Sequence, residues 1–122
     1  MSVPILKQGS ILIASVQSEL TDADLTQLRD DLLERVGSFR VSGVIIDVTA
    51  LDVIDSFAAR TLSNTAEMVR LRGASTVIVG IQADVAFSMI QLGLTFRNVI
   101  TALDLEEGLA ILNTAGRDHG RL

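Results

Sequence analysis

Apolar residues along the chain fall into two kinds of block: short continuous runs, and longer stretches in which they recur every three or four positions. Short runs rich in β-branched residues are typical of buried strands, whereas spacing of three and four is typical of an amphipathic helix. The runs predict strands over residues 3–7, 10–16, 44–48 and 76–81, and a last short one at 99–100. The periodic stretches predict helices from Thr21 or Asp22 to Gly37, and over residues 56–72, 84–92 and 104–113.

Each predicted helix has one apolar face that we expect to point into the core. The inward positions are Leu25, Leu28, Leu32 and Val36; Ala58, Leu62, Thr65, Ala66 and Val69; Val85, Met89 and Leu92; and Leu105, Leu109 and Leu112. Gly37, Gly73 and Gly93 follow three of these stretches, and glycine is common just past the end of a helix. Pro4 cannot donate a ladder hydrogen bond, which favours an edge position for the first strand.

The order of elements is therefore β-β-α-β-α-β-α-β-α. Strands that alternate with helices predict an α/β fold with a mostly parallel sheet, here of four to five strands with about four helices. Linkers, repeats and low-complexity segments are not evident in the sequence. We therefore expect one domain over residues 1–114, followed by a frayed polar tail over residues 115–122.

Composition narrows the classes of function. Hydrophobic residues make up 48% of the 122 positions, which excludes intrinsic disorder. Ten basic against fifteen acidic residues give a net charge of −5, which argues against electrostatic binding to nucleic acid or to an anionic membrane. The sequence has no cysteine and no apolar run near the ~18 residues of a membrane span, and no signal peptide is evident.

Residues for common enzymatic chemistry are scarce. The only histidine, His119, lies in the predicted tail, which excludes a Ser-His-Asp triad and leaves no spacing typical of a metal site. The glycine-rich motifs that cradle phosphates are also absent. Asp47, Asp52 and Asp55 cluster around the third strand and the turn after it, where they could do acid–base work or bond their own backbone. We favour the structural role, and we expect no catalytic residue, no cofactor and no metal.

Ser56 lies at the start of the helix that follows the 44–48 strand. In a parallel sheet, ligands and partners meet the carboxyl ends of the strands, and the first turn of a helix has unpaired N–H groups. Asp55 or Ser56 could simply cap this helix, which is worth about 1 kcal/mol. Ser56 could instead, or in addition, accept a phosphoryl group. Phe57 beside it could pack in the core or anchor a partner.

The strand-to-helix turn and the order of elements resemble the STAS domain of anti-sigma-factor antagonists. The turn reads I-D-x-T-x-x-x-x-I-D-S from Ile46 to Ser56, and the resemblance runs from Pro4 to about Leu112. Other similar segments are Pro4-Ile5-Leu6-Lys7, Gly80-Ile81-Gln82, Leu92-Gly93 and the stretch from Thr101 to Leu109. Simple antagonists carry Asp-Ser-Ser-Gly at the turn, whereas this chain has Asp55-Ser56-Phe57-Ala58, which is similar to the stand-alone STAS subunits of the bacterial stressosome.

This resemblance implies a non-enzymatic, cytoplasmic scaffold and switch. The expected partners are a sensor-bearing STAS paralogue in a large oligomer, a switch-type serine/threonine kinase that phosphorylates Ser56 and is then released, and a phosphatase that resets Ser56. A chain of this length has no room for a sensor domain of its own beside the STAS fold. From position alone, partner contacts are expected at Asp55, Phe57, Arg60 and Gln82.

Two other functions remain open at this point. One is a simple anti-sigma-factor antagonist that works as a small dimer or monomer with a sigma-binding kinase. The other is a small-molecule or nucleotide-binding module, or a weak enzyme, that uses Asp47, Asp52 and Asp55.

Overall fold

A five-stranded sheet forms the centre of the computed structural model, which describes residues 3–18, 20–97 and 99–120. The strands are β1 (Ile5–Gln8), β2 (Ile11–Ser15), β3 (Gly43–Asp47), β4 (Ser75–Val79) and β5 (Ile100–Ala102). They lie side by side in sequence order. β1 pairs antiparallel with β2 at one edge, and every other neighbouring pair is parallel. The predicted mostly parallel sheet and the edge position of the first strand are confirmed.

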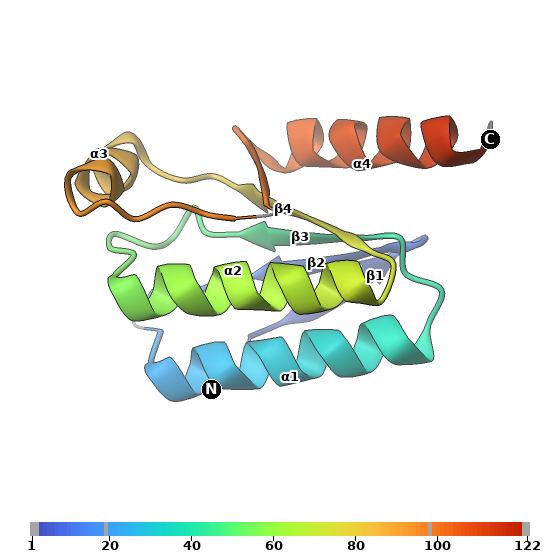
Figure 1. Ribbon diagram of the computed structural model, residues 1–122, viewed down its shortest axis with the longest axis horizontal. Coiled ribbons are helices and arrows are strands. Elements are labelled where there is room, and N and C mark those ends of the chain that lie inside the picture. Colours follow the sequence, from blue (N-terminus) through green and yellow to red (C-terminus); the bar gives the residue numbers. More distant parts are fainter. Residues whose placement is uncertain (1–2, 19, 98, 121–122) are drawn as a thin grey trace.

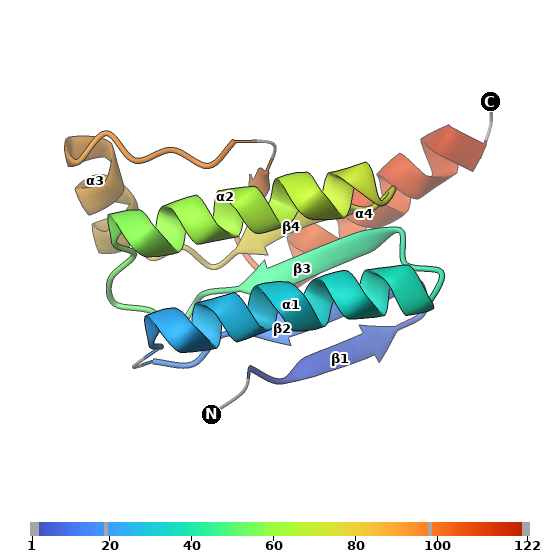
Figure 2. The ribbon, with the colours of Figure 1, turned by 60° about the horizontal axis from the view of Figure 1, so that its bottom comes forward.

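Four helices cover the sheet unequally. They are α1 (Asp22–Ser38), α2 (Ser56–Leu71), α3 (Ala83–Gln91) and α4 (Leu105–Gly120). α1 and α2 lie next to each other on one face, and α4 lies on the opposite face (Figures 1 and 2). α3 sits beyond the carboxyl ends of the strands (Figure 1). None of the helices in the described ranges is long and apolar enough to cross a membrane.

Two hydrophobic cores result, one on each face of the sheet. The strands alternate between them with the period of two expected for a pleated strand. In β3, Val44 and Ile46 join the larger core with α1 and α2, while Ile45 joins a smaller one with Leu112 of α4. Because both faces of β3 are covered, its sequence is a continuous apolar run instead of an alternating one.

α1 begins with a reciprocal cap. Thr21 Oγ1 accepts from the backbone N–H of Asp24 at 3.1 Å, and Asp24 Oδ2 accepts from the backbone N–H of Thr21 at 3.0 Å. The backbone N–H and then the hydroxyl of Thr21 lower the pKa of Asp24. This capping box confirms the predicted start, whereas Gly37, the predicted stop, lies inside the helix, which ends at Ser38.

The predicted end of α4 at Asn113 is wrong by seven residues, because the helix continues to Gly120. The apolar pattern stops at Leu112, the last buried residue among those of α4 whose side chains the structure describes. No proline follows in the sequence, so the backbone can continue helical beyond the apolar pattern. The segment predicted to be frayed is thus helical over residues 115–120. The side chain of His119 and residues 121–122 lie outside what the structure describes, and the domain limit at residue 114 stays a prediction.

Leu92 was expected to point inward from α3, but its side chain is 68% exposed. The helix ends at Gln91 in a Schellman motif: the N–H of Gly93 donates to Ile90 O at 3.1 Å, and that of Leu94 donates to Met89 O at 2.9 Å. Gly93 supplies the left-handed φ of +69° that this turn needs. The turn brings Leu94, instead of Leu92, against the core.

Candidate functional site

The chain leaves the sheet at Asp47 and reaches α2 through a loop over residues 48–55. Leu51 and Ile54 are buried in the larger core and fasten this loop to the domain. Between them, Asp52 and Val53 are exposed. The loop is therefore anchored by Leu51 and Ile54 and presents Asp52 and Val53 to solvent.

Two hydrogen-bonded contacts hold the first part of the loop. Asp47 Oδ1 accepts from the backbone N–H of Thr49 at 2.9 Å and from its hydroxyl at 2.6 Å. Gln82, at the start of α3, donates from Nε2 to Thr49 O at 2.7 Å. Gly80 has φ +81°, and a Cβ on it would clash with Thr49 Oγ1. A glycine is thus required there, both for its conformation and for the close approach of Thr49.

Asp55 is the N-cap of α2. Its Oδ1 accepts from the backbone N–H of Ala58 at 2.8 Å, and its carbonyl accepts from the N–H of Ala59 at 2.9 Å. Of the two predicted caps, the structure thus selects Asp55. Ser56 is the first residue of the helix and is exposed, and its hydroxyl makes no hydrogen bond to any residue in the described ranges. The serine hydroxyl is therefore accessible and has no capping role.

The other predicted contact residues differ in their surroundings. Phe57 is half-buried and packs against the larger core, which supports its interpretation as a core residue. Arg60 is exposed one turn further along α2. Gln82 is also exposed, but its amide holds Thr49 and thus positions the loop that leads to Ser56.

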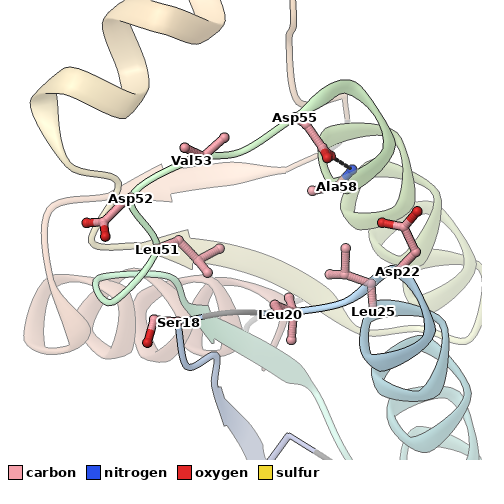
Figure 3. A pocket seen from close by; sticks show the side chains of 9 residues that line it. All are labelled: Ser18, Leu20, Asp22, Leu25, Leu51, Asp52, Val53, Asp55 and Ala58. Atoms are coloured by element: carbon pink, nitrogen blue, oxygen red, sulfur yellow. Dashed lines mark hydrogen bonds between the residues drawn. The ribbon is translucent and has the colours of Figure 1, made fainter.

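A cleft of about 440 Å³ lies on one side of the start of α2. Its lining residues are Ser18, Leu20, Asp22, Leu25, Leu51, Asp52, Val53, Asp55 and Ala58 (Figure 3). The Asp55 carboxylate points to the backbone of Ala58, and Asp52 lies on the far side of the cleft from Asp22 (Figure 3). Asp47 is not part of this lining.

The three clustered aspartates do not form a metal centre. Over the part of the chain that the structure describes, no group of three histidine, cysteine, aspartate or glutamate residues could hold an ion. Asp47 and Asp55 each accept a backbone N–H, as the structural interpretation predicts.

A second groove, also of about 440 Å³, lies beside Ser56. It is lined by Ser56, Ala59, Arg60, Ser63, Asn64, Gly93, Leu94, Thr95 and Arg97. The backbone N–H of Arg97 donates to Ser63 Oγ at 3.3 Å, which fastens the segment after α3 to α2. Arg97 was not among the predicted site residues, because nothing in the local pattern shows that a residue 41 positions after Ser56 returns to it.

The sequence profile of the STAS domain matches residues 2–108. The chain belongs to the STAS domain family. This result confirms the resemblance drawn from the turn before Ser56, and the α/β sheet is the STAS fold.

Individual STAS proteins agree with this assignment. The chain is 32% identical to the RsbT co-antagonist protein RsbRA of Bacillus subtilis over 109 residues, which are 88% of the chain and 38% of RsbRA. The chain thus spans about two fifths of the length of this curated relative.

Two solved structures are similar over most of their length. A serine-to-glutamate variant of RsbS from Moorella thermoacetica matches with a TM-score of 0.81 at 32% identity, covering 94% of this chain and 97% of that one. A chain from the solved molecular architecture of the stressosome also matches, with a TM-score of 0.77 at 33% identity, covering 93% of this chain and 99% of that one. The stressosome is described there as a signal integration and transduction hub. The chain is therefore similar to RsbS- and RsbR-type stressosome proteins in both sequence and fold.

Proposed function

We propose that this chain is a non-enzymatic scaffold and switch subunit of a cytoplasmic, stressosome-type assembly. It packs with a sensor-bearing STAS paralogue in a large oligomer and holds a switch-type serine/threonine kinase. Phosphorylation of Ser56 releases the kinase to a downstream stress response, and a phosphatase restores the serine.

Similarity to stressosome proteins supports the assembly part of this proposal. The match to the solved stressosome chain covers 93% of this chain, and the relative RsbRA is described as an RsbT co-antagonist. A family of related STAS chains that act together suits a co-assembled scaffold.

The environment of Ser56 supports the phosphorylation switch in this proposal. Because Asp55 takes the cap of α2, the Ser56 hydroxyl is exposed and has no hydrogen bond within the described residues. A phosphoryl group there lies at the positive end of a helix dipole, where negative charge is favourable. The fold can therefore accept the modification.

The transfer itself needs no group from this chain other than the serine. Ser56 Oγ bonds to the γ-phosphorus of ATP held by the kinase, the bond to the bridging oxygen breaks, and ADP leaves. The hydroxyl proton passes to a base of the kinase. The product carries about −1.5 to −2 additional charges, which takes the net charge of the chain from −5 to about −7.

Intact mass spectrometry tests the site. We expect wild type to gain one phosphoryl group when incubated with MgATP and the switch-type kinase of the same organism. Ser56→Ala should gain none, whereas Ser88→Ala, which changes an exposed serine on α3, should behave as wild type. Phosphorylation of Ser56→Ala, or an unmodified wild type beside an active kinase, would overturn Ser56 as the switch.

The size of the complex tests the assembly. A particle in the megadalton range, formed with a sensor-bearing STAS paralogue, is expected by light scattering. A small heterocomplex with the kinase would instead support the simple anti-sigma-factor antagonist.

A further inference from the structure

The groove beside Ser56 is positively charged in an acidic protein. Arg60 and Arg97 line it, and it contains no carboxylate. Neither guanidinium makes an ion pair with any residue in the described ranges. By contrast, Arg29 and Arg70 are paired with Asp30 and Glu67. Two arginines with no ion pair among the described residues therefore line the same groove as the candidate phosphoacceptor.

The geometry of α2 places one of these arginines next to Ser56. Residues four apart on a helix are neighbours, with Cβ atoms about 5–6 Å apart, so Ser56 and Arg60 lie on the same side of α2. Arg97 comes from the segment after α3, whose backbone is fastened to Ser63 of α2. A phosphoryl group on Ser56 thus has one arginine on its own helix and a second arginine in the lining of the same groove.

The rest of the lining also suits a phosphate. Ser63, Asn64 and Thr95 provide hydroxyl and amide groups that can donate hydrogen bonds. Asp55 is the nearest carboxylate in the sequence, and its Oδ1 is engaged with the backbone N–H of Ala58. Guanidinium groups bind phosphate oxygens in charge-assisted, often bidentate, hydrogen bonds.

We infer that Arg60 and Arg97 form an internal phosphate site that receives the phosphoryl group of phospho-Ser56. This inference rests on the proposed function, since it needs the modification at Ser56. The two positive charges of the groove are then offset by the phosphate, and a partner that used them before phosphorylation loses them. The phosphate also links α2 to the 93–97 segment.

Phosphorus NMR tests this site without any kinase. Phosphoserine is incorporated at position 56 during translation, and the second pKa of the phosphate is measured by titration. In wild type, Arg60, Arg97 and the α2 dipole favour the dianion, while the Asp55 carboxylate opposes it. We expect the second pKa to lie below the usual value of about 6.

Neutral variants separate the effect of the two arginines on the second pKa from the effect of the helix dipole. Arg60→Gln and Arg97→Gln should each raise the second pKa, and the double variant should raise it by about half a unit or more. Arg40→Gln removes an exposed arginine near the amino end of β3, at the opposite end of the strands from Ser56, and should leave the value unchanged.

An unchanged second pKa in the double variant would overturn the phosphate site. So would an equal shift in Arg40→Gln, because the effect would then reflect net charge alone. The result is independent of the kinase experiment: a missing phosphorylation of Ser56 contradicts the proposed function, whereas this titration reports only on where the phosphate binds.

Discussion

Two clefts of about 440 Å³ flank the start of α2, and they carry opposite charge. The one toward α1 contains Asp22, Asp52 and Asp55 and no basic residue. The one toward the 93–97 segment contains Arg60 and Arg97 and no acidic residue. The net charge of −5 therefore does not describe the surface beside Ser56, which lies on the positive side of this boundary.

The two sides also differ in what their charges do for the fold. Asp55 caps α2 and Asp22 lies in the first turn of α1, so both stabilise helix starts. Arg60 and Arg97 form no ion pair within the described part of the chain. The acidic side is thus largely explained by folding, whereas the basic side points to a function.

The largest effect is expected on kinase binding, when a negative charge is placed at Ser56 beside the groove lined by Arg60 and Arg97. Ser56→Asp should weaken kinase capture roughly a hundredfold, since loss of about 3 kcal/mol of binding free energy has this effect. The phosphoserine chain should show at least the same loss, which guards against a poor mimic. Asp52→Asn, on the acidic side, is the control and should bind as wild type. Wild-type affinity of the phosphoserine chain, measured by calorimetry, would contradict the switch.

The next largest effect is expected on stability, at the contact between Gly80 and Thr49 that holds the loop over residues 48–55. Gly80→Ala should lower the free energy of unfolding by about 3 kcal/mol, because it combines a left-handed φ with a clash against Thr49. Gly93→Ala is the matched control, because Gly93 has φ +69° but no atom lies within 4 Å of the added Cβ. It should lower the free energy of unfolding by only about 1 kcal/mol. Equal losses in urea unfolding would show that the contact with Thr49 does not matter.

A smaller effect is expected on the acidic side. Asp55→Ala should cost about 1 kcal/mol of stability, because it leaves the N–H of Ala58 without its cap. Asp52→Ala should change stability by less than about 0.5 kcal/mol, since Asp52 is exposed in the loop. Thermal unfolding of both variants checks this, and a larger loss for Asp52→Ala would contradict the assigned roles.

The smallest effect on the free energy of unfolding should come from replacing Arg60 and Arg97. The unphosphorylated Arg60→Gln/Arg97→Gln variant should unfold within about 0.5 kcal/mol of wild type, because these exposed side chains form no ion pair with any residue that the structure describes. A loss of more than about 1 kcal/mol in urea unfolding would give the basic side a structural role and remove the contrast between the clefts.

Much of the fold follows from local sequence patterns. Strands and helices with buried apolar residues could be predicted because burial sets their period, as for Leu25, Leu28 and Leu32 in α1. The residue types at the start of α2 predicted a cap at Asp55 or Ser56, and the structure places it at Asp55. The end of α4 could not be predicted, because its last turns lack large apolar residues in the sequence. The stop at Gly93 after α3 was predicted, but the turn there packs Leu94 instead of Leu92 against the core.

The candidate site was only half predictable. Asp55 and Ser56 are adjacent at the start of α2 and Arg60 lies one turn further along, so the sequence places them together. Arg97 joins them through the path of the chain after α3 and its bond to Ser63, which no local pattern specifies. The role of Gln82 depends in the same way on a contact with Thr49, 33 positions away.

Release of the kinase on phosphorylation of Ser56 can be measured directly on the assembled particle. The kinase is bound to the assembled scaffold, MgATP is added, and size-exclusion chromatography measures how much kinase stays with the large particle. We expect wild type to lose its kinase, while an assembly with Ser56→Ala binds the kinase equally well and keeps it. Release from both assemblies, or from neither, would contradict Ser56 as the switch.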